Sequence, residues 1–318
     1  EKNMKKTLLI TGGSGFLGSC LAKKLMSKYK IILGSRNNSQ NRLAAEKIGC
    51  SFTPLDVVNI ESIRDAFNKY QPDIVIHAAA TKYVDLAEEF PFECIDVNII
   101  GSMNLARVAI ESKTKIVIGI STDKTAPPIN NIYGLSKSIM EKLYCTLNNQ
   151  NKTFFSCVRF GNIAWSTGSV FPIWKKMSEN NKIIHSTGPN MRRFFFTVDE
   201  AADLVINCLK NINLTKGKVL CVNMKSTQIK NILNLWKQKY KISWKKMNER
   251  KGDKQDEFLI GNSELPFTKK IFINGKKHFL ISFNEKVKNK LKKSLSTKNS
   301  EKLKNKEIIN LIDSARYD

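Results

Sequence analysis

The stretch 121–137, STDKTAPPINNIYGLSK, gathers side chains that can move protons. Tyr133 and Lys137 are four residues apart and therefore lie on one face of a helix. A cationic Lys137 lowers the pKa of the phenol, so a tyrosinate can take a proton from a sugar hydroxyl while hydride leaves the same carbon. Thr122 follows an apolar strand and would hydrogen-bond that oxygen. These residues predict an oxidation step that passes a hydride to a cofactor.

Asp123 and Lys124 add chemistry that oxidation alone does not require. Once carbon C4 of a sugar is a ketone, the C5 proton becomes acidic and a nearby base can remove it. We expect Lys124 to be this base and Asp123 to be the acid that protonates the departing C6 hydroxyl, after which the stored hydride returns to C6. The alternative is that the two residues only form an ion pair at the strand end.

A glycine-rich turn, TGGSGFLG (11–18), follows the first apolar run and opens a helical segment. Gly12 permits a tight turn, Gly15 lets the backbone approach a pyrophosphate, and Gly18 allows the helix to pack closely on the strand. A glycine motif in this strand–turn–helix position predicts a dinucleotide site.

The end of the second strand indicates which dinucleotide binds. An NAD site usually has an acidic residue here for the ribose hydroxyls, whereas this chain has Ser35 and Arg36. Arg36 suits a 2′-phosphate as a bidentate donor, so the sequence favours NADP, and the alternative is a solvated arginine. Asp56 could meet the adenine, the small residues of HAAA (77–80) leave room for the cofactor, and His77 is expected to be structural. The residues expected at the cofactor are Gly12, Ser14, Gly15, Phe16, Leu17, Gly18, Ser35, Arg36, Asp56, Val57, Ala78, Ala79, Ala80, Tyr133 and Lys137.

The elements that must position these residues follow from an alternation of apolar runs with helical patterns. This alternation predicts βαβ units and an α/β fold with a doubly wound, Rossmann-type parallel sheet. The apolar runs are 6–11, 30–35, 50–56, 73–79, 115–121 and 154–160, and the helical segments are 16–28, 59–69, 92–112 and 133–149.

The second half of the chain is less regular. We expect residues 1–160 to form the NADP-binding domain, to which 198–223 returns as a helix and a strand. Residues 161–197 and 224–318 are expected to form a smaller, mixed substrate-binding region, with an ordered terminal helix over 297–313.

Composition sets further bounds. The 318 residues are 42% hydrophobic and carry a net charge of +25. The lysines are spread along the chain without interleaved aromatic residues, which favours solvated faces and an anionic substrate over nucleic-acid binding. The seven cysteines are scattered singly, so no metal site is expected and a reducing, cytoplasmic location fits. No run approaches the roughly 18 apolar residues of a membrane span, so no integral membrane association is expected.

Taken together, these motifs resemble the extended short-chain dehydrogenases of the UDP-N-acetylglucosamine 4,6-dehydratase type, the polysaccharide-biosynthesis group. The resemblance covers nearly the whole chain. It runs through TGGSGFLG, HAAATKYVDLAEEFPFECIDVNIIGS (77–102), STDK…YGLSK, RFGNIAWSTGSVFP (159–172), GPNMRRFFFTVDEA (188–201) and RKGDKQDEFLI (250–260).

The resemblance implies an NADP-dependent 4,6-dehydratase of a UDP-amino sugar that acts as a homo-oligomer in surface-glycan biosynthesis. It also implies further site residues: Lys82 and Asn98 at the cofactor and sugar, and Asn162, Arg193, Arg250 and Glu257 at the nucleotide sugar. The two arginines suit a pyrophosphate clamp.

Two departures from the family pattern bear on the product. Thr167 stands where the family usually has an arginine, and the loop from Asp123 to Tyr133 is longer by Asn130 or Asn131. The C5 stereochemistry therefore stays open. The alternatives are a C4 epimerase or 4-ketoreductase on the same fold and, more remotely, a non-catalytic nucleotide-sensing protein with a basic surface.

Overall fold

The computed structural model describes residues 5–181, 183–248 and 253–315. Its centre is a nine-stranded sheet with the order β14-β15-β10-β6-β5-β4-β1-β2-β3. The strands from β10 to β3 are parallel, and β15 and β14 continue the sheet as an antiparallel edge. The strands are β1 Thr7–Thr11, β2 Lys30–Ser35, β3 Ser51–Pro54, β4 Ile74–His77, β5 Ile116–Ile120, β6 Phe154–Arg159, β10 Val219–Val222, β14 Thr268–Ile273 and β15 Lys276–Ile281.

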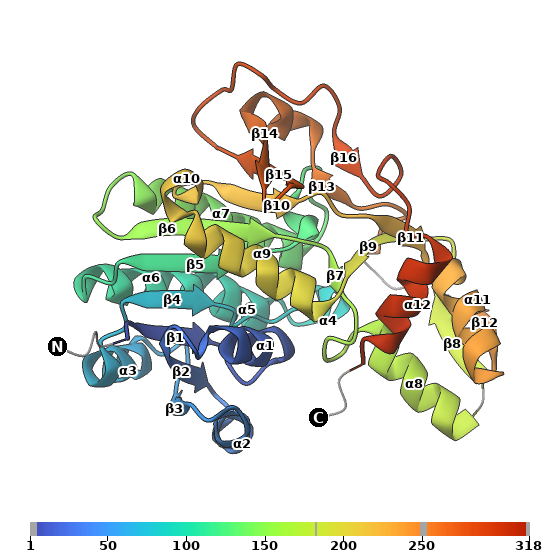
Figure 1. The fold of residues 1–318 in the computed structure, drawn as a ribbon, viewed down its shortest axis with the longest axis horizontal. Helices are drawn as coiled ribbons and strands as arrows, with labels where there is room; N and C mark the ends of the chain where they lie inside the picture. Colours follow the sequence, from blue (N-terminus) through green and yellow to red (C-terminus); the bar gives the residue numbers. More distant parts are fainter. Residues whose placement is uncertain (1–4, 182, 249–252, 316–318) are drawn as a thin grey trace.

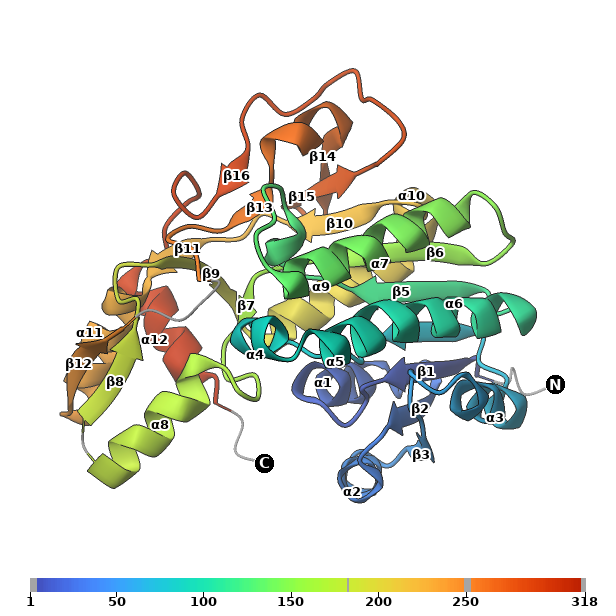
Figure 2. The ribbon, with the colours of Figure 1, turned by 180° about the vertical axis from the view of Figure 1, so that it is seen from behind.

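Helices cover both faces of this sheet, as the alternation of apolar runs and helical patterns predicted. Helices α1 and α9 pack on one face, and α3, α6 and α7 on the other (Figures 1 and 2). The Rossmann-type α/β fold is confirmed. The helices are α1 Phe16–Leu25, α2 Asn38–Ile48, α3 Ile60–Tyr70, α4 Val84–Glu89, α5 Pro91–Ile95, α6 Gly101–Glu111, α7 Ile132–Asn148, α9 Val198–Lys210 and α10 Ile212–Thr215, with a π-helical turn at Asp96–Ile100.

Local sequence explains where these helices begin. Asn59 precedes α3, and its side chain accepts hydrogen bonds from the first free backbone N–H groups. Thr197 and Glu200 form a reciprocal capping box at the start of α9. Asn131 caps α7 by accepting a 2.7 Å hydrogen bond from Gly134 N, so the longer loop ends in a residue that fixes the helix start.

A smaller region lies beside the carboxyl ends of the parallel strands (Figure 1). It has its own apolar core, in which Phe171, Trp174 and Trp236 are buried. Its elements are β7 Asn162–Ile163, β8 Ile183–Thr187, β9 Arg192–Phe196, β11 Ser226–Gln228, β12 Ser243–Met247, β13 Phe258–Ile260, β16 Leu295–Ser296, α8 Val170–Asn181, α11 Ile229–Tyr240 and α12 Asn305–Asp313.

The structure differs from the sequence predictions at two places in the C-terminal half. Residues 268–281, expected in the substrate-binding region, extend the large sheet as β14 and β15, because β10 leaves an edge open to pairing. The terminal helix begins at Asn305 rather than near 297, since Thr297 and Ser300 hydrogen-bond the chain near Glu257 and Ser226. In the described part of the chain, no helix has the length and apolar character needed to cross a membrane.

Candidate active site

The glycine-rich turn lies where β1 meets α1, at the edge of the sheet formed by the carboxyl ends of the strands. Gly12 has a φ of +66°, and a Cβ there would lie 2.9 Å from Ala79 N. At Gly18 a Cβ would lie 2.6 Å from Gly12 O, so the helix could not approach the turn as closely. These close approaches explain two of the glycines, and they leave backbone N–H groups at the start of α1 for an anion.

A cleft of about 540 Å³ runs from this turn to α7 and into the smaller region. It brings together predicted residues from six separate segments of the chain. The predicted residues that line it are Gly12, Ser14, Gly15, Phe16, Leu17, Gly18, Ser35, Ala78, Ala80, Lys82, Thr122, Lys124, Tyr133, Lys137 and Asn162. The lining residues that the sequence did not predict include Gln40, Tyr83, Ser121, Phe160, Gly161, Ser166, Thr167, Gly168 and Phe195.

Some predicted cofactor residues lie outside this lining. Arg36 is exposed just beyond β2, Val57 is buried, and Ala79 is half-buried behind its two lining neighbours. Asp56 turns its carboxylate to its own loop, where Oδ1 accepts a 3.0 Å hydrogen bond from Val58 N.

Asn98 and His77 are buried below the cleft. The Asn98 side-chain amide hydrogen-bonds the backbone N and O of Thr81 at 3.0 and 3.1 Å. Asn98 therefore acts on the cleft indirectly, by holding the loop between β4 and α4 that carries Thr81. His77 lies 2.8 Å from Thr11 Oγ1 and 3.1 Å from Ser102 Oγ. Burial, together with Lys137, lowers the pKa of His77 to about 3, so it is neutral and structural, as expected.

Tyr133 and Lys137 lie on the first two turns of α7. Burial raises the pKa of Tyr133 to about 12, while the Lys124 ammonium and the Thr122 hydroxyl act in the opposite direction. We expected Lys137 to lower this pKa; instead burial dominates, and Lys124 is the opposing cation. Burial also lowers the pKa of Lys137 to about 8, because it disfavours the charged ammonium, whose Nζ lies 3.5 Å from the neutral Met140 Sδ.

Asp123 and Lys124 belong to a 3₁₀ turn, Asp123–Thr125, that follows β5. Lys124 Nζ lies 3.1 Å from Asp123 Oδ1 and 3.7 Å from Glu257 Oε1. Burial opposes a charge on Lys124, but the Asp123 and Glu257 carboxylates outweigh it and raise the pKa of Lys124 above its ordinary value. The Asp123 side chain has 0% exposure and that of Lys124 has 16%, so Lys124 is the member of the pair that faces the cleft.

The predicted substrate residues divide between the cleft and the layer behind it. Lys82 and Asn162 line the cleft. Arg193 and Glu257 are buried next to Lys124, with Arg193 Nε 3.9 Å from Glu257 Oε1. Arg250 lies outside the described residues.

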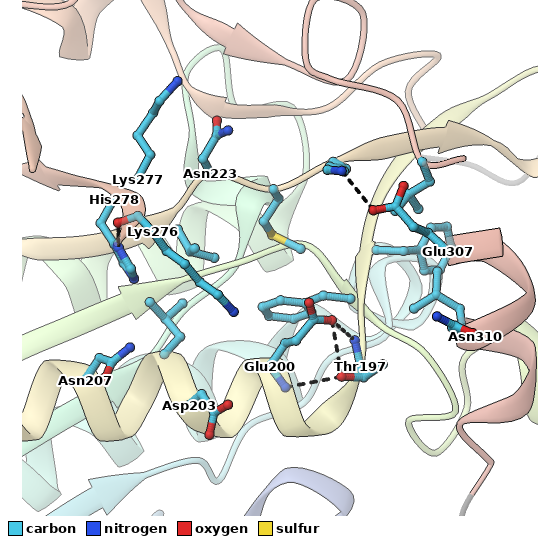
Figure 3. Close-up of a pocket in the computed structure, with 18 residues that line it drawn as sticks. Thr197, Glu200, Asp203, Asn207, Asn223, Lys276, Lys277, His278, Glu307 and Asn310 are labelled. Atoms are coloured by element: carbon cyan, nitrogen blue, oxygen red, sulfur yellow. Dashed lines mark hydrogen bonds and ion pairs between the residues drawn. The ribbon is translucent and has the colours of Figure 1, made fainter. Parts of the chain in front are cut away.

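A second cavity of about 500 Å³ lies on the α9 side of the sheet, between α9, β15 and α12 (Figure 3). Some of its charged groups already have partners. Glu200 accepts a hydrogen bond from the backbone N–H of Thr197, and Lys225 Nζ lies 2.8 Å from Glu307 Oε1. The glycine turn, Tyr133 and Lys137 do not line it. The first cleft is therefore the candidate active site.

A Rossmann-type sheet whose cleft joins a glycine turn to a Tyr/Lys pair defines the class of short-chain-dehydrogenase-like proteins. Comparison with known proteins narrows this class. A family profile described as "Polysaccharide biosynthesis protein" matches residues 8–275, and the chain belongs to this family.

Individual relatives carry two different activities in their names. The chain is 34% identical over 277 residues to UDP-glucose 4-epimerase of Rickettsia bellii, which covers 82% of this chain and 79% of that one. It is 32% identical over 274 residues to UDP-N-acetylglucosamine 4,6-dehydratase (inverting) of Campylobacter jejuni, and this match covers 83% of this chain and 80% of that one. Among solved structures, Pen from Bacillus thuringiensis matches with a TM-score of 0.88 at 26% identity over 98% of both chains.

Proposed function

We propose that this protein is an NADP-dependent 4,6-dehydratase that acts on a UDP-amino sugar, with UDP-N-acetylglucosamine as the first candidate. The observation that carries the proposal is the Asp123–Lys124 pair, 3.1 Å apart, whose lysine lines the same cleft as Tyr133 and Lys137. Oxidation at C4 needs only Tyr133, Lys137 and a hydride acceptor, whereas elimination also needs a base and an acid. The named Campylobacter relative supports this activity.

In this proposal the Tyr133 phenolate takes the proton of the C4 hydroxyl, with Lys137 one turn away on the same face of α7 and Lys124 as the cation that lowers the phenol pKa. A bound nicotinamide nucleotide would supply the hydride chemistry, as the acceptor at C4 and the donor at C6. Burial raises the pKa of Tyr133 to about 12, so its phenolate, once formed, is a strong base for this proton. The glycine turn and the small residues Ala78 and Ala80, which line the cleft, would hold the cofactor at this position.

The elimination step uses the ion pair as a closed proton cycle. Transfer of one proton from Lys124 Nζ to Asp123 Oδ1 converts ammonium and carboxylate into an amine and a carboxylic acid. The amine then takes the C5 proton, and the acid supplies the proton that the C6 oxygen carries away as water. Because Asp123 is buried, the Thr122 hydroxyl, 3.2 Å from Asp123 Oδ1 and on the cleft wall, offers the path. When hydride reaches C6, the Lys124 ammonium returns a proton to C5. The proton that Tyr133 took from the C4 hydroxyl then restores the pair to ammonium and carboxylate and Tyr133 to phenolate.

The choice of NADP rests on the end of β2. No carboxylate follows this strand, and Ser35 Oγ accepts a 3.1 Å hydrogen bond from Ser14 Oγ of the glycine turn. Arg36 comes next and is exposed, so it is free to reach a 2′-phosphate at the mouth of the cleft. We propose Lys82 and Asn162 as direct sugar-nucleotide contacts, with Arg193 and Glu257 behind them. Arg250, which lies outside the described residues, is proposed as a further substrate contact.

We propose that the protein works as a homo-oligomer in a reducing cytoplasm. Helices α4, α5 and α7 lie side by side (Figure 2). Phe92 is 82% exposed, and Phe90, Leu135 and Ile139 are also exposed on these helices. Burying this face against a second copy would remove a large apolar patch from water.

The direct test is incubation with UDP-N-acetylglucosamine. A product lighter by one water, with a C6 methyl group in its proton NMR spectrum, is expected. Unchanged mass with inversion at C4 would instead identify an epimerase, the second candidate, which the name of the Rickettsia relative supports. A Lys124→Ala variant separates the two, because an epimerase needs no base at C5.

A further inference from the structure

Glu141 is a buried carboxylate one helical turn beyond Lys137. Tyr133, Lys137 and Glu141 follow at intervals of four residues, so they lie along one face of α7. The residue is only 1% exposed. It does not line the cleft, and neither the dehydrogenation nor the elimination steps use it.

The Glu141 carboxylate contacts both sides of the catalytic turn. Its Oε1 accepts a 2.5 Å hydrogen bond from Ser121 Oγ, and Thr125 Oγ1 lies 2.9 Å away. Ser121 and Thr125 flank the three residues Thr122, Asp123 and Lys124. One oxygen of α7 thus fixes both ends of the segment that carries the acid–base pair.

Arg159, at the end of β6, connects Glu141 to the smaller region. Its guanidinium binds Glu141 through Nε at 3.0 Å and through Nη2 at 2.6 Å. On its other side it lies 2.8 and 3.0 Å from the two oxygens of Glu264, and Nη1 donates to Leu259 O at 2.9 Å. Leu259 belongs to β13, the strand that begins directly after Glu257. The buried triad of Glu141, Arg159 and Glu264 therefore also fixes the strand that brings Glu257 to Lys124.

The helix start completes this arrangement. A Cβ on Gly134 would collide with Lys124 O, so the first turn of α7 packs directly on the catalytic turn. A buried ion triad is a weak source of net stability, because desolvation of the charges offsets their attraction. Its geometry, in contrast, is tightly specified, since each polar atom has a fixed partner.

We propose that Glu141 is a positioning residue that holds the Thr122–Lys124 turn against Tyr133 and Lys137. Arg159 connects the Glu141 carboxylate to β13 and so holds that strand in place as well. This inference rests on the proposed dehydratase function. Tyr133 and Lys137 are on α7 itself and keep their places without the tether, whereas Lys124 is on the tethered turn. Loss of the tether should therefore impair elimination more than the first hydride transfer.

Thr125→Val is the sharpest test, because it removes the hydroxyl that contacts Glu141 Oε1 and Thr122 O while keeping side-chain volume and all buried charges. We expect elimination to slow by about 10- to 100-fold, the usual cost of a misplacement near 1 Å. Hydride transfer should change by less than about threefold, so reduced cofactor should build up in a single turnover. Thr125→Ser should restore elimination. Thr114→Val, at the other end of β5 and also buried, is the matched control and should leave both rates unchanged.

Glu141→Gln is the second variant, with thermal unfolding and cofactor binding measured alongside. An equal loss of both steps in the folded Glu141→Gln protein, or an unchanged ratio of the two rates in Thr125→Val, would overturn the proposal.

A readout without substrate keeps this test separate from the proposed function. Competitive acylation of Lys124 by acetic anhydride, read by mass spectrometry, should be faster in Thr125→Val than in Thr114→Val. Absence of dehydration by the wild-type protein would refute the dehydratase function alone. Equal labelling of Lys124 in the two variants would refute the positioning role.

Discussion

Replacing Lys124 with alanine should separate the two halves of the proposed reaction. The first hydride transfer depends on Tyr133 and Lys137, so it should continue, although more slowly, because the Tyr133 phenol loses the cation that lowers its pKa. Elimination loses its base and should slow by about 10² to 10⁴, the usual contribution of a positioned acid–base group. This range corresponds to about 3 to 5 kcal/mol in the activation free energy.

The structure also predicts a stability cost for this variant. Lys124 and Asp123 form a buried pair 3.1 Å apart, and removal of one partner of such a pair costs about 3–5 kcal/mol. The pKa of Lys124 is raised above its ordinary value of 10.5, so the pair stabilises the fold fully below that pH and loses its effect only as the pH rises further. At neutral pH the whole cost should appear in thermal unfolding.

The assay is a single turnover with UDP-N-acetylglucosamine and oxidised cofactor in deuterated water. Near-ultraviolet absorbance should rise and persist in Lys124→Ala, and deuterium should enter C5 slowly. Tyr133→Phe should show no absorbance change, and Lys142→Ala, an exposed lysine on the same helix, should resemble the wild type. Normal dehydration by Lys124→Ala, or a loss of hydride transfer as complete as in Tyr133→Phe, would refute the division of roles.

Three other predictions follow from single features of the structure. Arg36→Ala should weaken NADP binding by about 10- to 100-fold and leave NAD binding unchanged, as read by cofactor titration, because a charge-assisted contact to the 2′-phosphate is lost; an unchanged preference would contradict the assignment. Lys137→Met should abolish hydride transfer yet raise the unfolding temperature at pH 7. The pKa of Lys137 falls from 10.5 to about 8 on burial, so its ammonium costs the fold about 3 kcal/mol below pH 8, and this cost fades as the pH rises toward 10.5; a lower unfolding temperature would count against it. Light scattering should find a dimer or larger assembly, and Phe92→Glu should shift it toward monomer; a monomeric wild type at micromolar concentration would disprove the oligomer.

The first six strands of the main sheet could be predicted from the sequence. The six predicted apolar runs became β1 to β6 with ends shifted by at most two residues. Such runs are local signals, because a strand covered on both faces must be apolar along its length. The glycine turn was readable for the same reason, since Gly12 and Gly18 are required by contacts within their own βα unit and the strand beside it.

The C-terminal half was less predictable. Whether residues 268–281 join the large sheet depends on the free edge of β10, which no local pattern in those residues records. Residues 297–304 read as helical, but hydrogen bonds to Glu257 and Ser226 hold part of them extended. Long-range pairing overrides local preference in both cases.

The sequence by itself determined which groups could react, because Tyr133, Lys137, Asp123 and Lys124 are close along the chain and their spacing places them. Only the tertiary structure decided how these groups are charged and held. Glu257, Arg193 and Glu264 come from distant segments. Glu257 adds to the effect of Asp123 in raising the pKa of Lys124, Arg193 opposes it, and Glu264 binds the Arg159 guanidinium that also holds Glu141. The physical reason is that burial and ion pairing depend on distances between segments, and those distances are fixed only when both layers of the fold are packed together.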